Sequence, residues 1–437
     1  MKLKKNNFIA KLLKKSVIRA KEYEAKAYGL YPSDFDQAVL SVIETLKQHG
    51  FQAYIVGGGV RDQILKLNSK DFDVATDAHP EEIKKCFSRA LIIGKRFRLV
   101  HVYFNRRDYI EVATFRAGHQ HAQHKSDAQT KKGGIIARDN VYGTLEEDAF
   151  RRDFTVNALY YDPIRGKVFD YCEGIPDLKA KVLRLIGKPH VRFKEDPVRI
   201  LRALRFANKM GFTIEEKTLR AIPEDLPMLA EISGGRLFDE YTKLMLYGQA
   251  YKNFYTLRDF KALVYLFPFT LEYLEESWFI QMINLALENT DERFYQNKTI
   301  HPAFLIAVFL YAEFLNNFQR LSKTMSRKQA FQDAMDMTLK AQSKHTSMPN
   351  FFSQMVRDVW SLQHALELRR KNKVLEILKH PRFRAAYDFM LLRADVGKVN
   401  QGIAKFWTEV QTLEEATLLA QFSPPEKNKK PNKAAEE

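Results

Sequence analysis

The stretch Tyr54-Ile-Val-Gly-Gly-Gly-Val-Arg-Asp62, followed by Lys70-Asp-Phe-Asp-Val74, predicts a strand, a glycine turn, a short helix and a second strand. Ile55 and Val56 are apolar and β-branched, which favours a buried strand. The three glycines allow a tight turn and a close approach of the backbone to a ligand. The helix after the turn would direct free N–H groups toward an anion. The stretch therefore predicts a phosphate-binding turn.

The second strand carries two aspartates, Asp71 and Asp73. Side chains alternate between the two faces of a strand, so both carboxylates are expected on one face. Neighbouring carboxylates repel each other unless a cation lies between them, and such oxygen ligands suit Mg²⁺, with Mn²⁺ as an alternative. A glycine turn or an Asp-x-Asp pair alone is more often an ordinary connection or strand end. Together, and in this order, they indicate a nucleotidyl-transfer site.

The composition is that of a globular and basic protein. The chain has 437 residues, 45% of them hydrophobic, and its 70 Lys and Arg against 53 Asp and Glu give a net charge of +17. This excess favours a polyanionic partner, nucleic acid before membrane. The two cysteines, Cys86 and Cys172, fit a reducing compartment and exclude a disulfide framework or a cysteine zinc site. No apolar run approaches 18 residues, so we expect a cytoplasmic protein with no transmembrane segment.

Charge and hydrophobic periodicity divide the chain into five predicted parts. Nine Lys and Arg and two Glu in Met1–Tyr28 suggest a mobile basic arm near RNA, although an amphipathic membrane helix or a transit peptide would show a similar pattern. After Asp177 the periodicity is helical almost to the end. The predicted parts are a basic N-terminal arm (1–30), an α+β head with a small mixed sheet (31–175), an all-α neck (176–250), an all-α RNA-binding body and leg (251–420) and a disordered tail (421–437).

A third carboxylate lies on another predicted strand, Asp108–Phe115. Glu111 falls on one face of this strand, which we expect to pair near Asp71 and Asp73. It is either the third metal ligand or a charged residue of an edge strand, and the sequence leaves both open. The long polar segment 116–140 contains His119, His121 and His124, but with no cysteine nearby a zinc site is disfavoured.

The stretch Glu146–Tyr161 predicts a helical turn that leads into a strand. Arg151, Arg152 and Asp153 meet at this junction, where they could hold triphosphate oxygens and orient catalytic groups. The same residues would otherwise form an ordinary surface ion cluster.

A helix is expected over Val191–Met210. Asp196, Arg199 and Arg202 are spaced three apart, which would place them on one helix face. A carboxylate beside an arginine offers both acceptors and donors to the edge of a purine. The alternative is an ordinary salt bridge within the helix.

Five motifs, in this order, resemble those of the class II template-independent nucleotidyltransferases, a family that includes bacterial poly(A) polymerases and CCA-adding tRNA enzymes. Together they cover about residues 50–210, and five ordered motifs are specific. The motifs are Val56-Gly-Gly-Gly-Val-Arg-Asp62, Asp71-Phe-Asp-Val74, Ile110-Glu-Val-Ala-Thr-Phe-Arg116, Glu147-Asp-Ala-Phe-Arg-Arg-Asp-Phe-Thr155 and Glu195-Asp-Pro-Val-Arg-Ile-Leu-Arg-Ala-Leu-Arg205.

The resemblance implies a role for each matching residue. Asp71 and Asp73 would bind two Mg²⁺ ions and act with Asp153 in catalysis; whether Glu111 or Asp153 lies nearer the metals is left open. The implied nucleotide-binding residues are Gly57, Gly58 and Arg61 at the phosphates, Arg116, Arg152 and Asn157 at phosphate or sugar, and Asp196 and Arg199 at the base, supported by Arg202 and Arg205.

Three further segments, Leu91–Val102, Gly235–Glu240 and Leu378–Asp388, look like the poly(A) polymerase version of the family. This implies an enzyme that adds AMP from ATP to RNA 3′ ends in mRNA processing and decay, with RNA and the RNA-decay machinery as partners. CCA addition to tRNA is the first alternative, and a non-catalytic basic RNA-binding protein is the second. The tail departs from the family, because four Lys and three Glu in residues 423–437 replace a dense arginine run.

Overall fold

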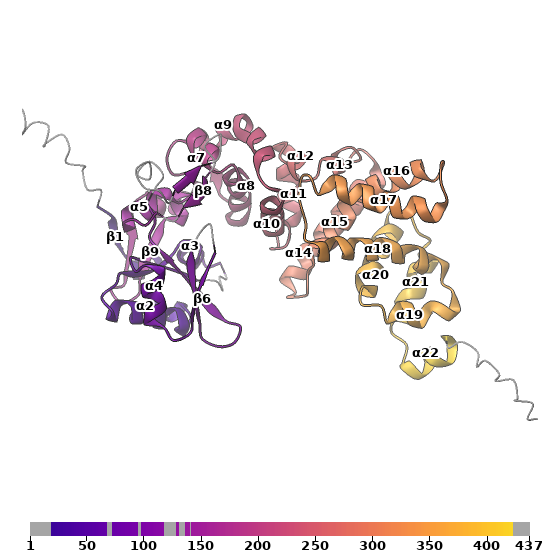
Figure 1. The fold of residues 1–437 in the computed structure, drawn as a ribbon, viewed down its shortest axis with the longest axis horizontal. Helices are drawn as coiled ribbons and strands as arrows, with labels where there is room; N and C mark the ends of the chain where they lie inside the picture. Colours follow the sequence, from indigo (N-terminus) through magenta and orange to yellow (C-terminus); the bar gives the residue numbers. More distant parts are fainter. Residues whose placement is uncertain are drawn as a thin grey trace, which may run out of the picture. The chain divides into compact units, whose positions relative to one another are not determined.

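The computed structural model of this chain describes residues 19–67, 72–94, 98–117, 128–130, 136–139 and 141–422 (Figure 1). The chain divides into two compact units, residues 1–228 and residues 229–437. The first contains an eight-stranded sheet, and the described elements of the second are helices. This confirms the predicted fold class, an α+β head followed by helices. The finer division into neck, body and leg stays a prediction.

The sheet of the first unit is mixed, as predicted. Two neighbouring strands, β3 and β6, run parallel, and the other neighbouring pairs are antiparallel. In spatial order the strands are β1 (Lys21–Glu24), β10 (Lys167–Asp170), β9 (Leu159–Asp162), β2 (Ala53–Val56), β3 (Asp73–Thr76), β6 (Tyr109–Thr114), β5 (Leu99–Tyr103) and β4 (Ala90–Ile93).

Helices cover one face of the β3–β6–β5 region. α2 (Gln37–Gln48) contacts β3 and β6, and α4 (Pro80–Cys86) contacts β4, β5 and β6. In β5 the fully buried Val100 and the nearly buried Val102 alternate with half-buried residues, so alternate side chains point to the opposite face. This opposite face is where the candidate site lies.

The predicted basic arm does not extend as far as residue 30. Lys21–Glu24 forms the edge strand β1, which pairs antiparallel with β10. Its charged side chains meet partners of opposite sign: Lys21 Nζ lies 2.5 Å from Glu173 and Lys167 Nζ lies 2.7 Å from Glu24. A charged edge strand carries little apolar periodicity, which explains why the sequence pattern did not reveal it. Residues 1–18 lie outside the described residues.

The helix expected over Val191–Met210 is two helices, α7 (Pro189–Glu195) and α8 (Val198–Met210). Asp196 lies between them in an extended conformation, with φ −152° and ψ 91°. The residue before a proline is disfavoured in the helical region, and Pro197 follows Asp196 directly. The prediction that Asp196 shares a helix face with Arg199 and Arg202 was therefore wrong.

The second unit is a stack of helices around the apolar α15 (Pro302–Phe309). This helix contacts α14 (Ser277–Tyr295), α16 (Tyr311–Leu321), α18 (Asn350–Leu368) and α20 (Phe383–Asp395). Two buried tryptophans anchor it, since the indole N–H of Trp360 donates to Ala307 O (3.1 Å) and that of Trp407 to Leu366 O (2.8 Å). The other main helices are α10 (Gly234–Met245), α11 (Ala250–Asp259), α17 (Arg327–Gln342), α21 (Gln401–Val410) and α22 (Glu415–Phe422).

Across the part of the chain that the structure describes, no helix has both the length and the apolar character that crossing a membrane requires.

Candidate active site

The glycine turn and Asp73 meet at one end of two neighbouring strands. Val56, the last residue of β2, pairs with Asp73, the first residue of β3. The chain then turns at Gly57 and enters α3 (Gly58–Ile64). Asp73 is exposed at this end. The order predicted from sequence, in which a carboxylate strand lies beside a glycine turn, is confirmed for this part.

A second carboxylate, Glu111, is placed beside Asp73 by the register of the sheet. β3 and β6 pair in parallel with Val74 opposite Val112, so the residues one step earlier, Asp73 and Glu111, are neighbours on the other face. Glu111 Oε1 also lies 3.5 Å from His101 Nε2 on β5. Carboxylate oxygens in this arrangement fit the ligand chemistry of Mg²⁺.

Asp71, the first member of the predicted pair, lies outside the described residues, as do His119, His121 and His124. Within the described ranges no group of three His, Cys, Asp or Glu side chains is arranged to hold a metal ion. Of the predicted metal ligands, the structure therefore describes Asp73 and Glu111. Asp71 stays a prediction from the sequence.

Gly57 is required at the turn for two reasons. Its φ of +69° with ψ of −128° is a conformation that side-chain-bearing residues rarely adopt. A Cβ at this position would also lie 3.1 Å from Nη1 of Arg152. The turn therefore brings the backbone close to a guanidinium that the sequence assigned to nucleotide binding. Gly58 follows as the first residue of α3.

Four predicted site residues form one hydrogen-bonded series, Arg61–Asn157–Asp153–Arg202. Arg61 Nη1 donates to Asn157 Oδ1, and Asn157 Nδ2 donates to Asp153 Oδ1 at 3.0 Å. Arg202 Nε and Nη2 lie 2.8 and 2.7 Å from Asp153 Oδ2. The series joins α3 to α8 through the short 3₁₀ turn η4 (Thr155–Asn157). It connects the glycine turn to the helix predicted to select the base.

The ring of Phe206 lies among three of the predicted arginines. The distances from its centroid to the guanidinium carbons are 4.8 Å for Arg61, 5.1 Å for Arg202 and 4.4 Å for Arg205. These contacts hold the guanidinium groups against an aromatic surface. Arg61 is 2% exposed and also pairs with Asp62, so it is positioned inside the fold.

Asp153 is held in its charged form. Burial alone would raise the pKa of Asp153, but the charge of Arg202 and the hydrogen bonds from Asn157 and Arg202 hold that pKa well below its usual range. Oδ1 also accepts the N–H of Phe154 at 2.8 Å. Both oxygens are thus occupied by donors, which favours a role in positioning its neighbours. Its assignment as a catalytic residue stays a prediction.

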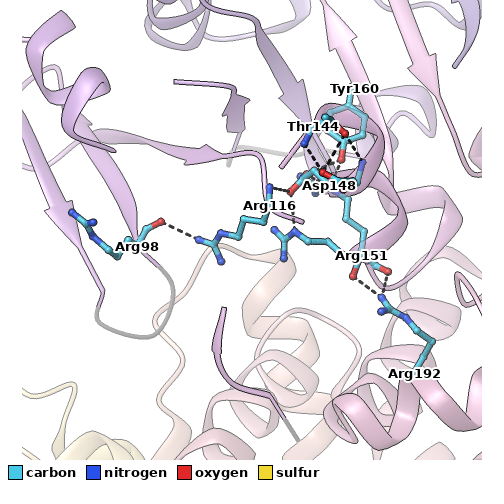
Figure 2. Close-up of polar contacts among 9 residues, drawn as sticks. Arg98, Arg116, Thr144, Asp148, Arg151, Tyr160 and Arg192 are labelled. Carbon is cyan, nitrogen blue, oxygen red and sulfur yellow. Dashed lines mark hydrogen bonds and ion pairs between the residues drawn. The ribbon is translucent and has the colours of Figure 1, made fainter. Parts of the chain in front are cut away.

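Asp148 is a central residue that the sequence reasoning missed (Figure 2). Its carboxylate accepts from Arg151 Nε (2.9 Å), from Arg152 Nη2 (3.0 Å) and from the hydroxyl of Tyr160 (2.7 Å). It is 1% exposed. Burial would raise the pKa of Asp148, and the two guanidinium groups with the Tyr160 hydroxyl hold it well below its usual range. The i, i+3 and i, i+4 spacing of Asp148 to the arginines was the available signal.

The Asp148 carboxylate also fixes Arg116. The backbone N–H of Arg116 donates to Asp148 Oδ1 at 3.2 Å, and its Nη2 donates to the carbonyl oxygen of Arg98 at 3.0 Å (Figure 2). Arg192 reaches the same region, where its Nη2 donates to the carbonyl oxygens of Arg151 (2.5 Å) and Arg152 (2.6 Å). Burial and then the neighbouring Arg199 lower the pKa of Arg192 to about 10.

Arg199 is buried and engaged within its own helical pair. Its Nη1 donates to Glu195 Oε2 at 3.0 Å and to the carbonyl oxygen of Arg192 at 2.8 Å. Asp196 is half-buried, and its Oδ1 accepts from the N–H of Val198 at 3.3 Å. The salt bridge of Arg199 is thus with Glu195. Selection of the base by Asp196 and Arg199 stays a prediction.

The fold and this end of the sheet are consistent with a nucleotidyltransferase, the class that the comparisons with known proteins show. Three family models match: "Poly A polymerase head domain" over residues 53–184, "Probable RNA and SrmB- binding site of polymerase A" over 211–274, and "Polymerase A arginine-rich C-terminus" over 323–436. The "Poly(A) polymerase I" of Haemophilus influenzae is 42% identical, covering 91% of this chain and 88% of the relative. That of Escherichia coli is 37% identical over 93% and 90%. The chain belongs to the poly(A) polymerase family.

CCA-adding enzymes are more partial relatives in sequence. That of Streptococcus gordonii is 40% identical over 49% of this chain and 51% of the relative. Among solved structures, a Thermotoga maritima CCA-adding enzyme complexed with tRNA matches with a TM-score of 0.57 and 20% identity, over 90% of this chain and 88% of that one. An apo CCA-adding enzyme matches with 0.59 and 20%, over 91% and 98%. These structures support the fold, and the full-length relatives confirm the predicted class of function, a poly(A) polymerase.

Proposed function

We propose that this chain adds AMP from ATP to RNA 3′ ends at the end of the sheet where Asp73 and the glycine turn meet. The observation that carries the proposal is the register of β2, β3 and β6. It places Asp73 beside both the entry to α3 and Glu111. Metal-binding oxygens and a phosphate-binding turn are the two parts that phosphoryl transfer requires side by side.

The metal ligands in this proposal are Asp71, Asp73 and Glu111. Mg²⁺ bound there would supply the charge that neutralises the ATP phosphates and activates the RNA 3′-hydroxyl. The register supports Glu111 over Asp153 as the third ligand, since the oxygens of Asp153 are occupied by Asn157, Phe154 and Arg202.

The remaining residues orient the nucleotide. The backbone at Gly57 and Gly58 would approach the triphosphate, with Arg152 beside it. Arg61, Asn157 and Asp153 fix that turn relative to α8, because each hydrogen-bonds to the next. Asp196, Arg199, Arg202 and Arg205 would select adenine, and Arg116 would contact phosphate or sugar.

RNA is the proposed partner, because the family model named "Probable RNA and SrmB- binding site of polymerase A" matches residues 211–274 and the chain has a net charge of +17. A tail-adding enzyme accepts varied sequences, so phosphate contacts should dominate binding. A cytoplasmic location and contact with the RNA-decay machinery are parts of the same proposal.

The proposal is tested by incorporation assays with each nucleoside triphosphate separately and with CTP and ATP together, on a generic RNA and on a tRNA that lacks its 3′-terminal CCA. Long tails made from ATP alone on the generic RNA are expected. Addition of two C and one A to the tRNA, with termination there, would replace the proposal by CCA addition. If no nucleotide is incorporated into either RNA, the non-catalytic RNA-binding protein is the interpretation that remains.

A further inference from the structure

Apolar and aromatic side chains gather on the open face of β4, β5 and β6, next to the proposed metal ligands. Leu91 on β4 pairs with His101 on β5, and His101 pairs with Glu111 on β6. Tyr103 and Tyr109 pair in the next row. We call Leu91, His101, Tyr103 and Tyr109 the aromatic face.

The aromatic face is partly exposed although its members are apolar or aromatic, since His101 and Tyr103 are half-buried and its other two members are exposed. Leu91 is 51% exposed and Tyr109 is 42% exposed. The opposite side of the same strands is buried, as Val100 (0%) and Val102 (3%) show. An exposed apolar patch on one side of a packed sheet marks a binding surface more often than a stability feature.

Two of the rings, His101 and Tyr109, stack on each other, and Tyr103 packs against Tyr109 at a tilt of 57°. The ring centroids of His101 and Tyr109 lie 3.8 Å apart with an angle of 10° between the planes, and Tyr103 lies 5.5 Å from Tyr109. An exposed ring that is held by neighbouring rings, as Tyr109 is, can form a platform on which unpaired bases stack with little sequence preference.

The turn beside the aromatic face is basic and ordered. Asn105 Oδ1 accepts the backbone N–H groups of Arg107 (2.8 Å) and Asp108 (2.7 Å), which fixes the connection between β5 and β6. Arg106 and Arg107 are exposed on this turn. Aromatic rings next to arginines complement a single-stranded nucleic acid, which presents bases and phosphates together.

The aromatic face continues directly into the proposed metal site. Tyr109 and Glu111 are two residues apart on β6, which is roughly 7 Å along a strand. That spacing is about two stacked nucleotides at 3.4 Å each. His101 is the link, since it stacks on Tyr109 and lies 3.5 Å from Glu111.

From these observations we infer that the aromatic face binds the last nucleotides of the RNA primer by stacking, while Arg106 and Arg107 hold its phosphates. This inference rests on the proposed function, because it names where the RNA 3′ end lies relative to the metal ligands. It assigns ATP elsewhere, to the glycine turn and α8.

The test uses the full chain with Tyr109→Ala, the conservative Tyr109→Phe, and Tyr31→Ala as a matched control, since Tyr31 is an exposed tyrosine (51%) that precedes α2. Tyr109→Ala should raise the KM for an RNA primer at least fivefold, because stacking on one aromatic side chain is worth about 1–3 kcal/mol. The KM for ATP should change less than twofold. Tyr31→Ala should match the wild type, and Tyr109→Phe, which keeps the ring, should have a primer KM far closer to the wild type than that of Tyr109→Ala.

Binding of a short 5′-labelled oligoadenylate, followed by fluorescence anisotropy without ATP, provides a readout that does not depend on catalysis. The double variant Arg106→Ala/Arg107→Ala should reduce the slope of log affinity against log salt by about 1.4, for two lost phosphate contacts on a single strand. An unchanged primer KM and unchanged oligoadenylate affinity, or a rise in the KM for ATP instead, would overturn the inference. Failure of the wild type to incorporate AMP would refute the proposed function. The oligoadenylate affinities of the wild type and the variants would still show whether the aromatic face binds RNA.

Discussion

The head unit contains two kinds of carboxylate within one sheet and its neighbouring helices. Asp73 and Glu111 lie on the open face, exposed and half-buried. Asp148 and Asp153 are enclosed, with side chains 2% and 10% exposed, and each is bound by arginine. All four are acidic residues within the sequence motifs, so residue type alone does not show which of them could bind a metal ion.

The difference teaches which carboxylates can serve a cation. A buried carboxylate bound by guanidinium groups has its charge compensated already, and it orders the residues around it. A carboxylate at an open strand end can bind a hydrated metal ion that enters with its nucleotide. We therefore separate a proposed metal-binding pair, Asp73 and Glu111, from a proposed positioning pair, Asp148 and Asp153.

The largest expected effect is loss of activity on Asp73→Ala. AMP incorporation should fall about a thousandfold or more, because a metal ion contributes several kcal/mol of transition-state stabilisation. The melting temperature should stay unchanged, since Asp73 is exposed. Glu44→Ala on α2, where Glu44 is also exposed, is the control. Incorporation at the wild-type rate by the Asp73 variant would remove Asp73 from the metal site.

Asp148→Asn should mainly cost stability. Breaking a buried ion pair by removing one partner costs about 3 kcal/mol, because it leaves the other charge uncompensated. The three tryptophans, Trp278, Trp360 and Trp407, lie in the second unit, so their fluorescence follows that unit while circular dichroism follows both. The denaturant midpoint should fall by circular dichroism and stay constant by fluorescence.

The control for this stability measurement is Glu22→Gln, which removes an exposed ion pair with Arg165. Such pairs contribute little, so its midpoint should match the wild type. A circular dichroism midpoint for Asp148→Asn equal to that of Glu22→Gln would contradict the positioning role of Asp148.

Asp153→Asn should lower kcat by roughly tenfold to a hundredfold, less than Asp73→Ala, because a misplaced residue in the nucleotide site costs up to about a hundredfold. The amide N–H₂ would face the Arg202 guanidinium and disrupt the series to Asn157. Steady-state kinetics of Asp153→Asn, Arg202→Gln and the double variant measure the coupling. The double variant should be little worse than either single one. Additive losses would show that the two residues act separately.

Low pH should destabilise the head unit, because it protonates Asp148 and Asp153. The pKa values of Asp148 and Asp153 are held below their usual range, so the folded state binds fewer protons than the unfolded state. Their contribution to stability is present above the ordinary aspartate pKa of about 4 and is lost as pH falls below it. Unfolding followed by circular dichroism from neutral pH downward should show a smaller loss for Asp148→Asn than for the wild type.

The sequence predicted the fold class and the order of the elements that carry the candidate site. The run of Ile55 and Val56 before three glycines specified the strand and turn, because local chemistry alone determines both. Glu111 was placed on a strand near Asp73, and the parallel pairing of β3 with β6 agrees with it. The roles of the other candidate residues were predicted from the resemblance of the motifs to the family.

Other features needed the structure. Arg61 and Asn157 are 96 positions apart, and no spacing rule predicts their hydrogen bond. Asp148 could have been predicted from its spacing to Arg151 and Arg152. The break at Asp196 could also have been predicted, since a proline follows it. The helical periodicity of the surrounding residues concealed that break.

The Mg²⁺ dependence of AMP incorporation by Glu111→Gln and by Asp153→Asn tests the separation of the two pairs most directly. Glu111→Gln should raise the Mg²⁺ concentration for half-maximal rate by about tenfold or more, because it removes a charged oxygen from the proposed metal ligands. Asp153→Asn should leave that concentration unchanged while it lowers kcat. The reverse pattern, a raised Mg²⁺ requirement in Asp153→Asn alone, would contradict the account.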